Sequence, residues 1–219
     1  MSRPATERDG REGSRTGIMT VKNQASIETP ETTIDWSVGD LEGASIQRSR
    51  KLLKDLAEVY PKHASSGLAP DTEVYSVQWW APAREGQEGG LLWGVTHLQP
   101  GRVGDEYFMT HGHFHALATR AEYYTAVSGQ GILLRMERSG HTWAEEMTPG
   151  ALLYIDGRHA HRVVNIGDEP LVFWACWPSD AGYDYGTIAR DGFGLRVLER
   201  NGKAVLAPVV KEQHVEHND

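Results

Sequence analysis

The 219-residue sequence is poor in the groups that would point to several common classes of protein. It has a single cysteine, Cys176, so no disulfide can form within the chain and no cluster of thiolates can bind a metal. Acidic residues outnumber basic ones, and the formal net charge of -8 argues against a general nucleic-acid binder, which needs a basic face. Any metal must therefore be held by histidine and carboxylate side chains.

Long apolar runs are also missing. No segment approaches the ~20 consecutive apolar residues that span a bilayer. The first residues, MSRPATERDGREGSRTG, alternate charges with Gly, Ser and Pro and contain no apolar run of the kind found in a signal peptide. We therefore expect a cytoplasmic protein with no membrane partner, built around one globular core.

Composition changes along the chain divide it into four predicted parts. Ser45 is a suitable cap for a short helix over 46–60, whose apolar residues recur near helical spacing and which Pro61 would stop. The expected organisation is a disordered tail over 1–31, an N-terminal extension with this one helix over 32–70, a β-barrel domain over 71–208 and a C-terminal tail over 209–219.

From about Thr72 onward, short segments rich in Val, Ile, Tyr, Trp and Leu alternate with turn residues, which is typical of an all-β domain. So many short antiparallel strands must hide their edges, and a double-sheet jelly roll or barrel is the usual solution. A β-sandwich with no central cavity is the alternative. The expected strands are 73–80, 91–98, 107–110, 122–127, 131–136, 142–147, 151–155, 161–165 and 171–177.

One segment, Thr110-His111-Gly112-His113-Phe114-His115, carries three histidines at alternate positions. In an extended strand, residues two apart face the same side, so His113 and His115 can direct both imidazoles at one point. His111 shares that parity. Gly112 permits an unusual backbone conformation that would turn the His111 side chain away.

Further ligands are available on neighbouring strands. Glu122 opens the next expected strand, and hairpin pairing would bring its carboxylate over the two histidines. Another imidazole comes from a later strand, where His159 and His161 compete because they share one parity. Each residue alone is more often a surface or hydrogen-bonded side chain, but three nitrogens and one oxygen in one barrel suit Fe(II), Mn(II), Ni(II) or Zn(II).

These segments resemble the two cupin motifs. His113, His115, Glu122 and Gly129 match the first motif, and Pro149, Gly150, His161 and Asn165 match the second. The match favours His161 over His159, because Asn165 follows His161 at the motif's spacing. One departure is the long connection from Ala116 through Ala121, where most cupins have fewer residues.

That departure points to one branch of the cupins. The segments 104–115, 120–122, 160–170 and 180–189 are together similar to the cupin-type phosphoglucose isomerases, and the similarity covers roughly residues 90–195. The resemblance implies a cupin jelly roll, a homodimer, and the interconversion of glucose 6-phosphate and fructose 6-phosphate. The exposed aromatic pair Trp79-Trp80 adds a weak hint of dimerisation. The resemblance to the isomerases also implies one divalent metal per subunit, with Fe(II) expected and Mn, Ni or Zn as alternatives, held by His113, His115, Glu122 and His161.

The resemblance assigns further roles by motif position. Glu122 and Tyr124 are expected to be catalytic, although packing on the strand face is an equal alternative for Tyr124. Trp177 stands where the family usually has a phosphate-facing tyrosine, and His111 stands where a lysine is common, so substrate preference is expected to differ. The residues expected to contact the sugar phosphate are Thr96, Thr110, Gly112 and Tyr185.

Two chemical routes and two other functions stay open at this point. Hydrogen can move between C1 and C2 as a proton, with Glu122 as base and an enediol intermediate, or as a hydride beside a metal that polarises both oxygens. The same four ligands also fit a dioxygenase or another sugar-phosphate isomerase or epimerase. A sugar-binding cupin without catalytic activity is the third possibility.

Overall fold

The computed structural model describes residues 27–60 and 66–209. By its contacts the chain divides into two compact units, Met1–Pro30 and Glu31–Asp219. The predicted tails fall mainly outside the described residues, so they stay predictions. The elements of the second unit are β1 (Thr32–Ile34), β2 (Leu41–Gly43), β3 (Gln47–Leu52), the 3₁₀ helix η1 (Leu53–Leu56), β4 (Glu73–Trp80), β5 (Leu91–Leu98), β6 (Arg102–Val103), β7 (Glu106–Tyr107), β8 (Phe114–His115), β9 (Glu122–Ser128), β10 (Gly131–Met136), β11 (Thr142–Met147), β12 (Leu152–Ile155), β13 (Ala160–Asn165), β14 (Leu171–Pro178), β15 (Tyr183–Asp184), α1 (Tyr185–Asp191), β16 (Leu195–Arg200) and β17 (Lys203–Pro208).

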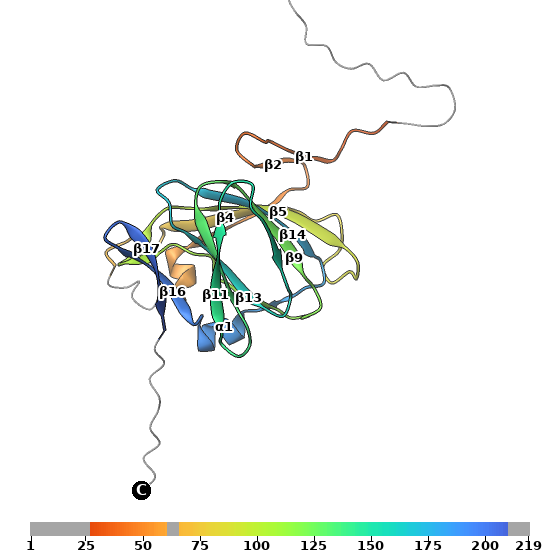
Figure 1. Cartoon of the computed structure of the whole chain (residues 1–219). Helices are drawn as coiled ribbons and strands as arrows, with labels where there is room; N and C mark the ends of the chain where they lie inside the picture. The colour runs from red at the N-terminus through yellow and green to blue at the C-terminus, as the bar shows by residue number, and fades with distance from the viewer. Residues whose placement is uncertain (1–26, 61–65, 210–219) are drawn as a thin grey trace, which may run out of the picture. The chain divides into compact units, whose positions relative to one another are not determined.

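Two antiparallel sheets form the body of the second unit (Figure 1). The larger sheet has the strand order β12-β9-β14-β5-β4-β3, and the smaller has the order β11-β10-β13. Residues directly opposite each other in antiparallel strands point to the same face. The pairs Val77 with Thr96 and Thr96 with Phe173 therefore align three side chains on the face that lines the central pocket. The predicted all-β class is confirmed.

The observed strand positions agree closely with those predicted from the sequence. β4, β5, β10 and β11 begin and end where the sequence predicts, while β9, β12, β13 and β14 differ by a single residue at one end. The strand predicted over 107–110 is shorter, because only Glu106–Tyr107 forms a strand and Met109 makes one isolated bridge to Val164. Residues that favour turns bound each run of strand-forming residues, and this punctuation explains the agreement.

The outer face of the larger sheet is covered by the hairpin of β1 and β2. Leu41 of this hairpin packs with Val95, Val172 and Trp174 in a second hydrophobic cluster. The Trp174 indole N–H also donates to the Gly39 carbonyl at 2.8 Å. Because this hairpin buries apolar side chains outside the barrel, the inner face remains available for polar groups.

The helix predicted over 46–60 is wrong. Gln47–Leu52 forms the edge strand β3, which pairs with β4, and only Leu53–Leu56 makes a single 3₁₀ turn. The physical reason is that five polar residues follow Ile46, so the apolar stripe of a helix does not begin there. The open edge of β4 supplies backbone partners for this polar segment instead. Pro61, the predicted stop, lies outside the described residues.

The C-terminal part of the fold was not predicted. β16 pairs with β17 and with β7, and a partly buried ion pair joins Arg196 to Glu106 at 2.7 Å. β15 pairs with β8, which places Tyr183 beside His115. In the part of the chain that the structure describes, no helix combines the length and apolar character that crossing a membrane requires.

Candidate metal centre

Four side chains from separate segments meet inside the barrel. His113, His115, Glu122 and His161 each bring one possible ligand atom to within 4.8 Å of the others. His115 lies on β8, Glu122 begins β9 and His161 lies on β13. His113 is held against His161 by two backbone hydrogen bonds, of 3.3 Å from the His113 N–H and 3.1 Å from the His161 N–H. The structure thus brings together the predicted set, and its role as a ligand set stays a prediction.

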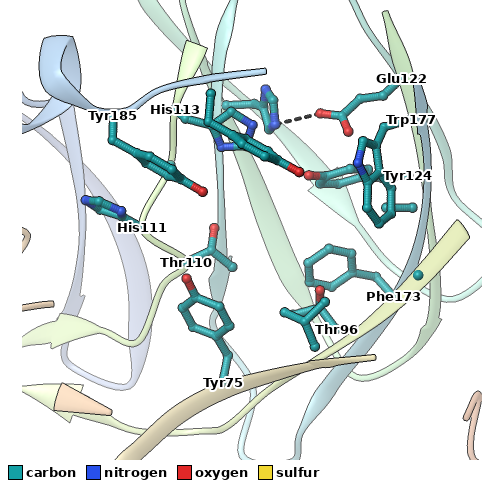
Figure 2. Close-up of a pocket in the computed structure, with 16 residues that line it drawn as sticks. Tyr75, Thr96, Thr110, His111, His113, Glu122, Tyr124, Phe173, Trp177 and Tyr185 are labelled. Carbon is teal, nitrogen blue, oxygen red and sulfur yellow. Dashed lines mark ion pairs between the residues drawn. The ribbon is translucent and has the colours of Figure 1, made fainter. Parts of the chain in front are cut away.

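The Glu122 carboxylate is the negative charge of this cluster. Its Oε1 lies 2.6 Å from His161 Nε2 and 3.2 Å from His115 Nε2, and the side chain is buried (Figure 2). Burial alone would raise the pKa of Glu122, but the charge of His161 and the hydrogen bonds from both imidazoles outweigh it and hold that pKa well below its usual range. Glu122 is therefore ionised at neutral pH and is a weak base.

The orientation of the His115 ring is fixed by a hydrogen bond from the nitrogen that points away from Glu122. Its Nδ1–H donates to the Arg120 carbonyl at 2.5 Å, which leaves Nε2 as the nitrogen that faces Glu122. Arg120 is itself anchored by hydrogen bonds of 2.6 and 2.9 Å to the Asp180 carboxylate. The long connection between His115 and Glu122 thus supplies the acceptor that sets the His115 tautomer.

His113 presents a nitrogen without a protein partner. Its Nε2 is buried and makes no hydrogen bond to any described residue, and the same holds for Nδ1 of His161. Burial, with a smaller contribution from the charge of His161, lowers the pKa of His113 well below its usual value, so the imidazole is neutral. A neutral imidazole with a free buried lone pair beside a carboxylate is the form that binds a metal, and these residues fit a divalent cation.

Two other histidines are excluded from the cluster. His111 Nε2 lies 2.6 Å from the Glu58 carboxylate, and its ring stacks on Tyr185 at a centroid distance of 4.6 Å. Gly112 adopts a φ of +78°, which turns His111 away as the sequence predicted. His159 Nδ1 lies 3.1 Å from an Arg135 guanidinium N–H and acts as its acceptor, which leaves His161 as the fourth member.

A pocket of about 150 Å³ opens beside the cluster and is lined by sixteen residues (Figure 2). His113, Glu122 and His161 form one part of its wall, while His115 lies behind it. The other predicted site residues that line this pocket are Thr96, Thr110, Gly112, Tyr124 and Tyr185, together with Trp177. All of them therefore lie where a small molecule bound in the pocket next to the cluster would contact them. Their individual roles stay predictions.

Sequence reasoning missed two tyrosines of the pocket wall, Tyr75 and Tyr183. Burial is the main reason that the pKa of Tyr75 rises to about 12, although its hydroxyl accepts a hydrogen bond from the His111 backbone. The signal for Tyr75 was the alternation within 73–80, which puts Tyr75 and Val77 on one face. Tyr183 has no such signal, because its position depends on the pairing of β15 with β8.

Tyr124 lies on β9 with its ring 5.2 Å from Phe173 and edge-on to His161 at 5.6 Å. Burial, reinforced by the Glu122 charge, raises the pKa of Tyr124 well above its usual value. The hydroxyl therefore keeps its proton at neutral pH and can donate a hydrogen bond. Among the described residues that line the pocket, Glu122 is the one carboxylate.

The family model and the curated relatives agree on one family. Residues 50–213 match the family model described as glucose-6-phosphate isomerase. The glucose-6-phosphate isomerase of Thermococcus litoralis is 40% identical over 179 residues, which cover 79% of this chain and 90% of the relative. That of Pyrococcus furiosus is 41% identical over 171 residues, covering 78% and 89%. Among solved structures, an oxalate decarboxylase from Bacillus subtilis aligns with a TM-score of 0.39 and 23% identity, covering 50% of this chain and 26% of that one.

Proposed function

The chain belongs to the cupin-type glucose-6-phosphate isomerase family and acts as a glucose-6-phosphate isomerase, and we propose that the buried cluster of three histidines and Glu122 is its metal centre. One observation carries this proposal: four possible ligand atoms, including an unpartnered His113 nitrogen, lie within 4.8 Å of one another beside a pocket. The mixed imidazole and carboxylate set supports Fe(II), with Mn(II), Ni(II) or Zn(II) as the other metals it accommodates.

A divalent metal at this position would polarise the oxygens on the two reacting carbons of the sugar. The chain's own contribution is to orient the substrate in a pocket lined by hydroxyl groups. Thr96, Thr110 and Tyr185, with the Gly112 backbone, are proposed to contact the sugar phosphate, and each lines the pocket. Tyr124 is proposed to donate a hydrogen bond to an oxygen at the reacting carbons, because its hydroxyl stays protonated.

The proposed ligand set favours one of the two chemical routes. Removal of the C2 proton requires a base, and Glu122, the one carboxylate among the described lining residues, is a ligand in the proposed centre, which lowers its basicity. Transfer of hydride directly from C2 to C1 requires no base at the carbon atom; the hydroxyl proton on O2 passes to O1 in the same conversion, so the atoms balance within the substrate. We therefore propose the hydride route, in which Glu122 stays ionised as a ligand and does not accept the proton.

A homodimer and a cytoplasmic setting complete the proposal. Tyr123 and Tyr154 face each other across β9 and β12 and are about half exposed, and Leu152 beside them is 69% exposed. Such an apolar patch supports association with a second copy of the chain. The pair Trp79-Trp80, which the sequence suggested as a dimer contact, supports dimerisation less than this patch does, because both side chains are partly buried. The lone Cys176 supports a reducing compartment.

A coupled assay with fructose 6-phosphate tests the proposed metal centre. We expect activity to disappear after treatment with a chelator and to return when a single divalent metal is restored. Oxygen uptake should be absent and unphosphorylated fructose should not be converted, which separates isomerisation from dioxygenase chemistry. Full activity in protein that retains no metal would contradict the proposed centre.

A further inference from the structure

Apart from the proposed metal, which the reacting carbons would occupy, the inner pocket carries no fixed positive charge, although a sugar phosphate brings ~1.5 to 2 negative charges at neutral pH. None of the described residues that line it is a lysine or an arginine. Arg162 lies close by, but its Nε and Nη2 both donate to the His111 carbonyl at 3.1 and 2.5 Å, and it does not line this pocket. A cation that meets the phosphoryl group has to be sought at the entrance.

The pocket opens outward into a second, wider cavity of about 700 Å³. Five residues line both spaces and form the throat between them: Tyr75, Val77, Trp177, Tyr183 and Tyr185. Beyond the throat, the wall is continued by the edge strand β3, which contributes Gln47, Ser49 and Lys51. The strand that was mistaken for a helix is thus part of the approach to the site.

The register of β3 on β4 places Lys51 next to the throat. Lys51 lies directly opposite Tyr75, and Ser49 lies opposite Val77, so these side chains share the inner face of the sheet. Arg50 points to the other face and forms an ion pair with Glu73 at 3.8 Å. Lys51 is therefore the basic residue of β3 that faces the cavity.

The Lys51 charge is not neutralised by a neighbouring acid. Within the described residues no carboxylate forms an ion pair with Lys51, whereas Lys54 pairs with Asp71 at 2.5 Å. The geometry leaves an available ammonium group on the wall of the outer cavity, beside the throat.

We propose that Lys51 binds the phosphoryl group of the substrate and makes the enzyme select phosphorylated over free sugars. This inference rests on the proposed function, which places the reacting carbons beside Glu122 and Tyr124. The phosphoryl group is on the carbon farthest from that pair, and Figure 2 shows Tyr75 and His111 on the side of the pocket away from Glu122. The Ser49 hydroxyl, two positions along the same face, is a further donor for the same anion.

The test is the Lys51→Met variant, which removes the charge and keeps most of the side-chain length. With fructose 6-phosphate we expect KM to rise about tenfold, the effect of one partly screened charge-assisted contact, while kcat stays within about twofold. The KM of the wild type should increase with ionic strength, and that dependence should become weaker in the variant. Inhibition by inorganic phosphate should weaken in parallel.

Two variants serve as controls. Lys51→Arg keeps a positive charge on the inner face of β3 and should recover most of the loss. Lys54→Met removes an exposed lysine that already pairs with Asp71 and does not line either cavity, so its KM should equal that of the wild type. Metal content and the circular dichroism spectrum should be the same in all variants, which shows that neither the centre nor the fold has changed.

An unchanged KM and unchanged phosphate inhibition in Lys51→Met would overturn the assignment. A tenfold effect in Arg84→Met, with none in Lys51→Met, would also overturn it and assign the anion contact to the other cation of the outer cavity. Failure of the proposed function is distinguishable, because it would leave the wild type inactive with every metal. Titration of metal-loaded wild type and Lys51→Met with inorganic phosphate then still decides whether Lys51 binds the anion.

Discussion

His161 Nε2 lies 2.6 Å from Glu122 Oε1, although the two residues belong to strands of different sheets. β9, which begins with Glu122, lies in the larger sheet, and β13, which carries His161, lies in the smaller one. The cluster therefore exists only when both sheets are packed face to face. A metal bound by these side chains would join the two sheets, so its affinity is expected to be coupled to folding.

Replacement of His161 by alanine should remove metal and activity together. Loss of one of four ligands is expected to weaken metal affinity at least about 100-fold, more than the loss of an outer hydrogen-bond partner. Metal content after dialysis and isomerase activity measure the two effects. His159→Ala is the matched control, because His159 instead accepts a hydrogen bond from Arg135 and should retain metal. A fully active His161→Ala variant without metal would refute the site.

Gly157→Ala should weaken metal binding, although Gly157 is not one of the proposed ligands. A Cβ at position 157 would lie 2.0 Å from the Arg120 carbonyl oxygen, the atom that accepts the His115 Nδ1–H. The connection before Glu122 must shift, and we expect metal affinity to fall about tenfold with a loss of about 1–3 kcal/mol of stability. Metal titration and denaturant unfolding measure both. Gly186→Ala, where the nearest atom lies at 3.9 Å, should leave the affinity unchanged.

Isomerisation in heavy water should give product with little deuterium on the sugar carbons. The hydride route keeps the hydrogen within the substrate, whereas an enediol exchanges it with solvent. Mass spectrometry of early product, before the reaction has cycled back, measures the deuterium content. Near-complete incorporation would show that a base in the pocket removes the proton and that Glu122 or another group is more basic than its surroundings indicate.

The stabilising effect of the Glu122 charge in metal-free protein should depend on pH with a definite sign. The pKa of Glu122 is depressed in the folded state, so its contribution is fully present above the ordinary value of 4.5 and is lost as pH falls through the lower folded value. The wild type should therefore be more stable than Glu122→Gln at pH 6, and the difference should shrink in strong acid. Denaturant unfolding of both proteins across this range measures it; a difference that grows on acidification would contradict the assignment.

Trp177 should be replaceable by tyrosine with a gain in affinity. Its ring packs against Gly94, where a Cβ would meet the indole at 2.9 Å. Trp177→Tyr adds a hydroxyl that can meet phosphate, and Trp177→Phe has the same ring without it. We expect the KM for fructose 6-phosphate to be a few-fold lower in the tyrosine variant than in the phenylalanine variant. Equal values would show that this position does not contact the phosphate.

Local sequence patterns and motif spacing were sufficient to predict most strand positions and the members of the histidine cluster. β4, β5, β10 and β11 were predicted residue by residue, because turn residues mark both ends of each run of strand-forming residues. The convergence of His113 and His115 followed from the same parity, and Gly112 explained the exclusion of His111. The choice of His161 over His159 came from the family motif, and the structure supports it through the bond between His159 and Arg135.

The segment 46–60 shows where local pattern was insufficient. Leu53 and Leu56 of this segment are indeed buried, but in a 3₁₀ turn that follows an edge strand. Whether a polar segment such as Gln47–Leu52 becomes a strand depends on a distant open edge, here that of β4. A local sequence window contains no information about that edge.

The sequence by itself determined the all-β class, the positions of the main strands along the chain and the residues able to bind a metal, because these depend on side-chain chemistry and on patterns that span a few residues. Only the tertiary structure decided which nitrogens face Glu122, that Tyr75 and Tyr183 form the throat, and that Lys51 stands at the entrance. Those facts depend on the register between strands distant in the chain, which hydrogen bonding and packing fix only after the sheets have formed.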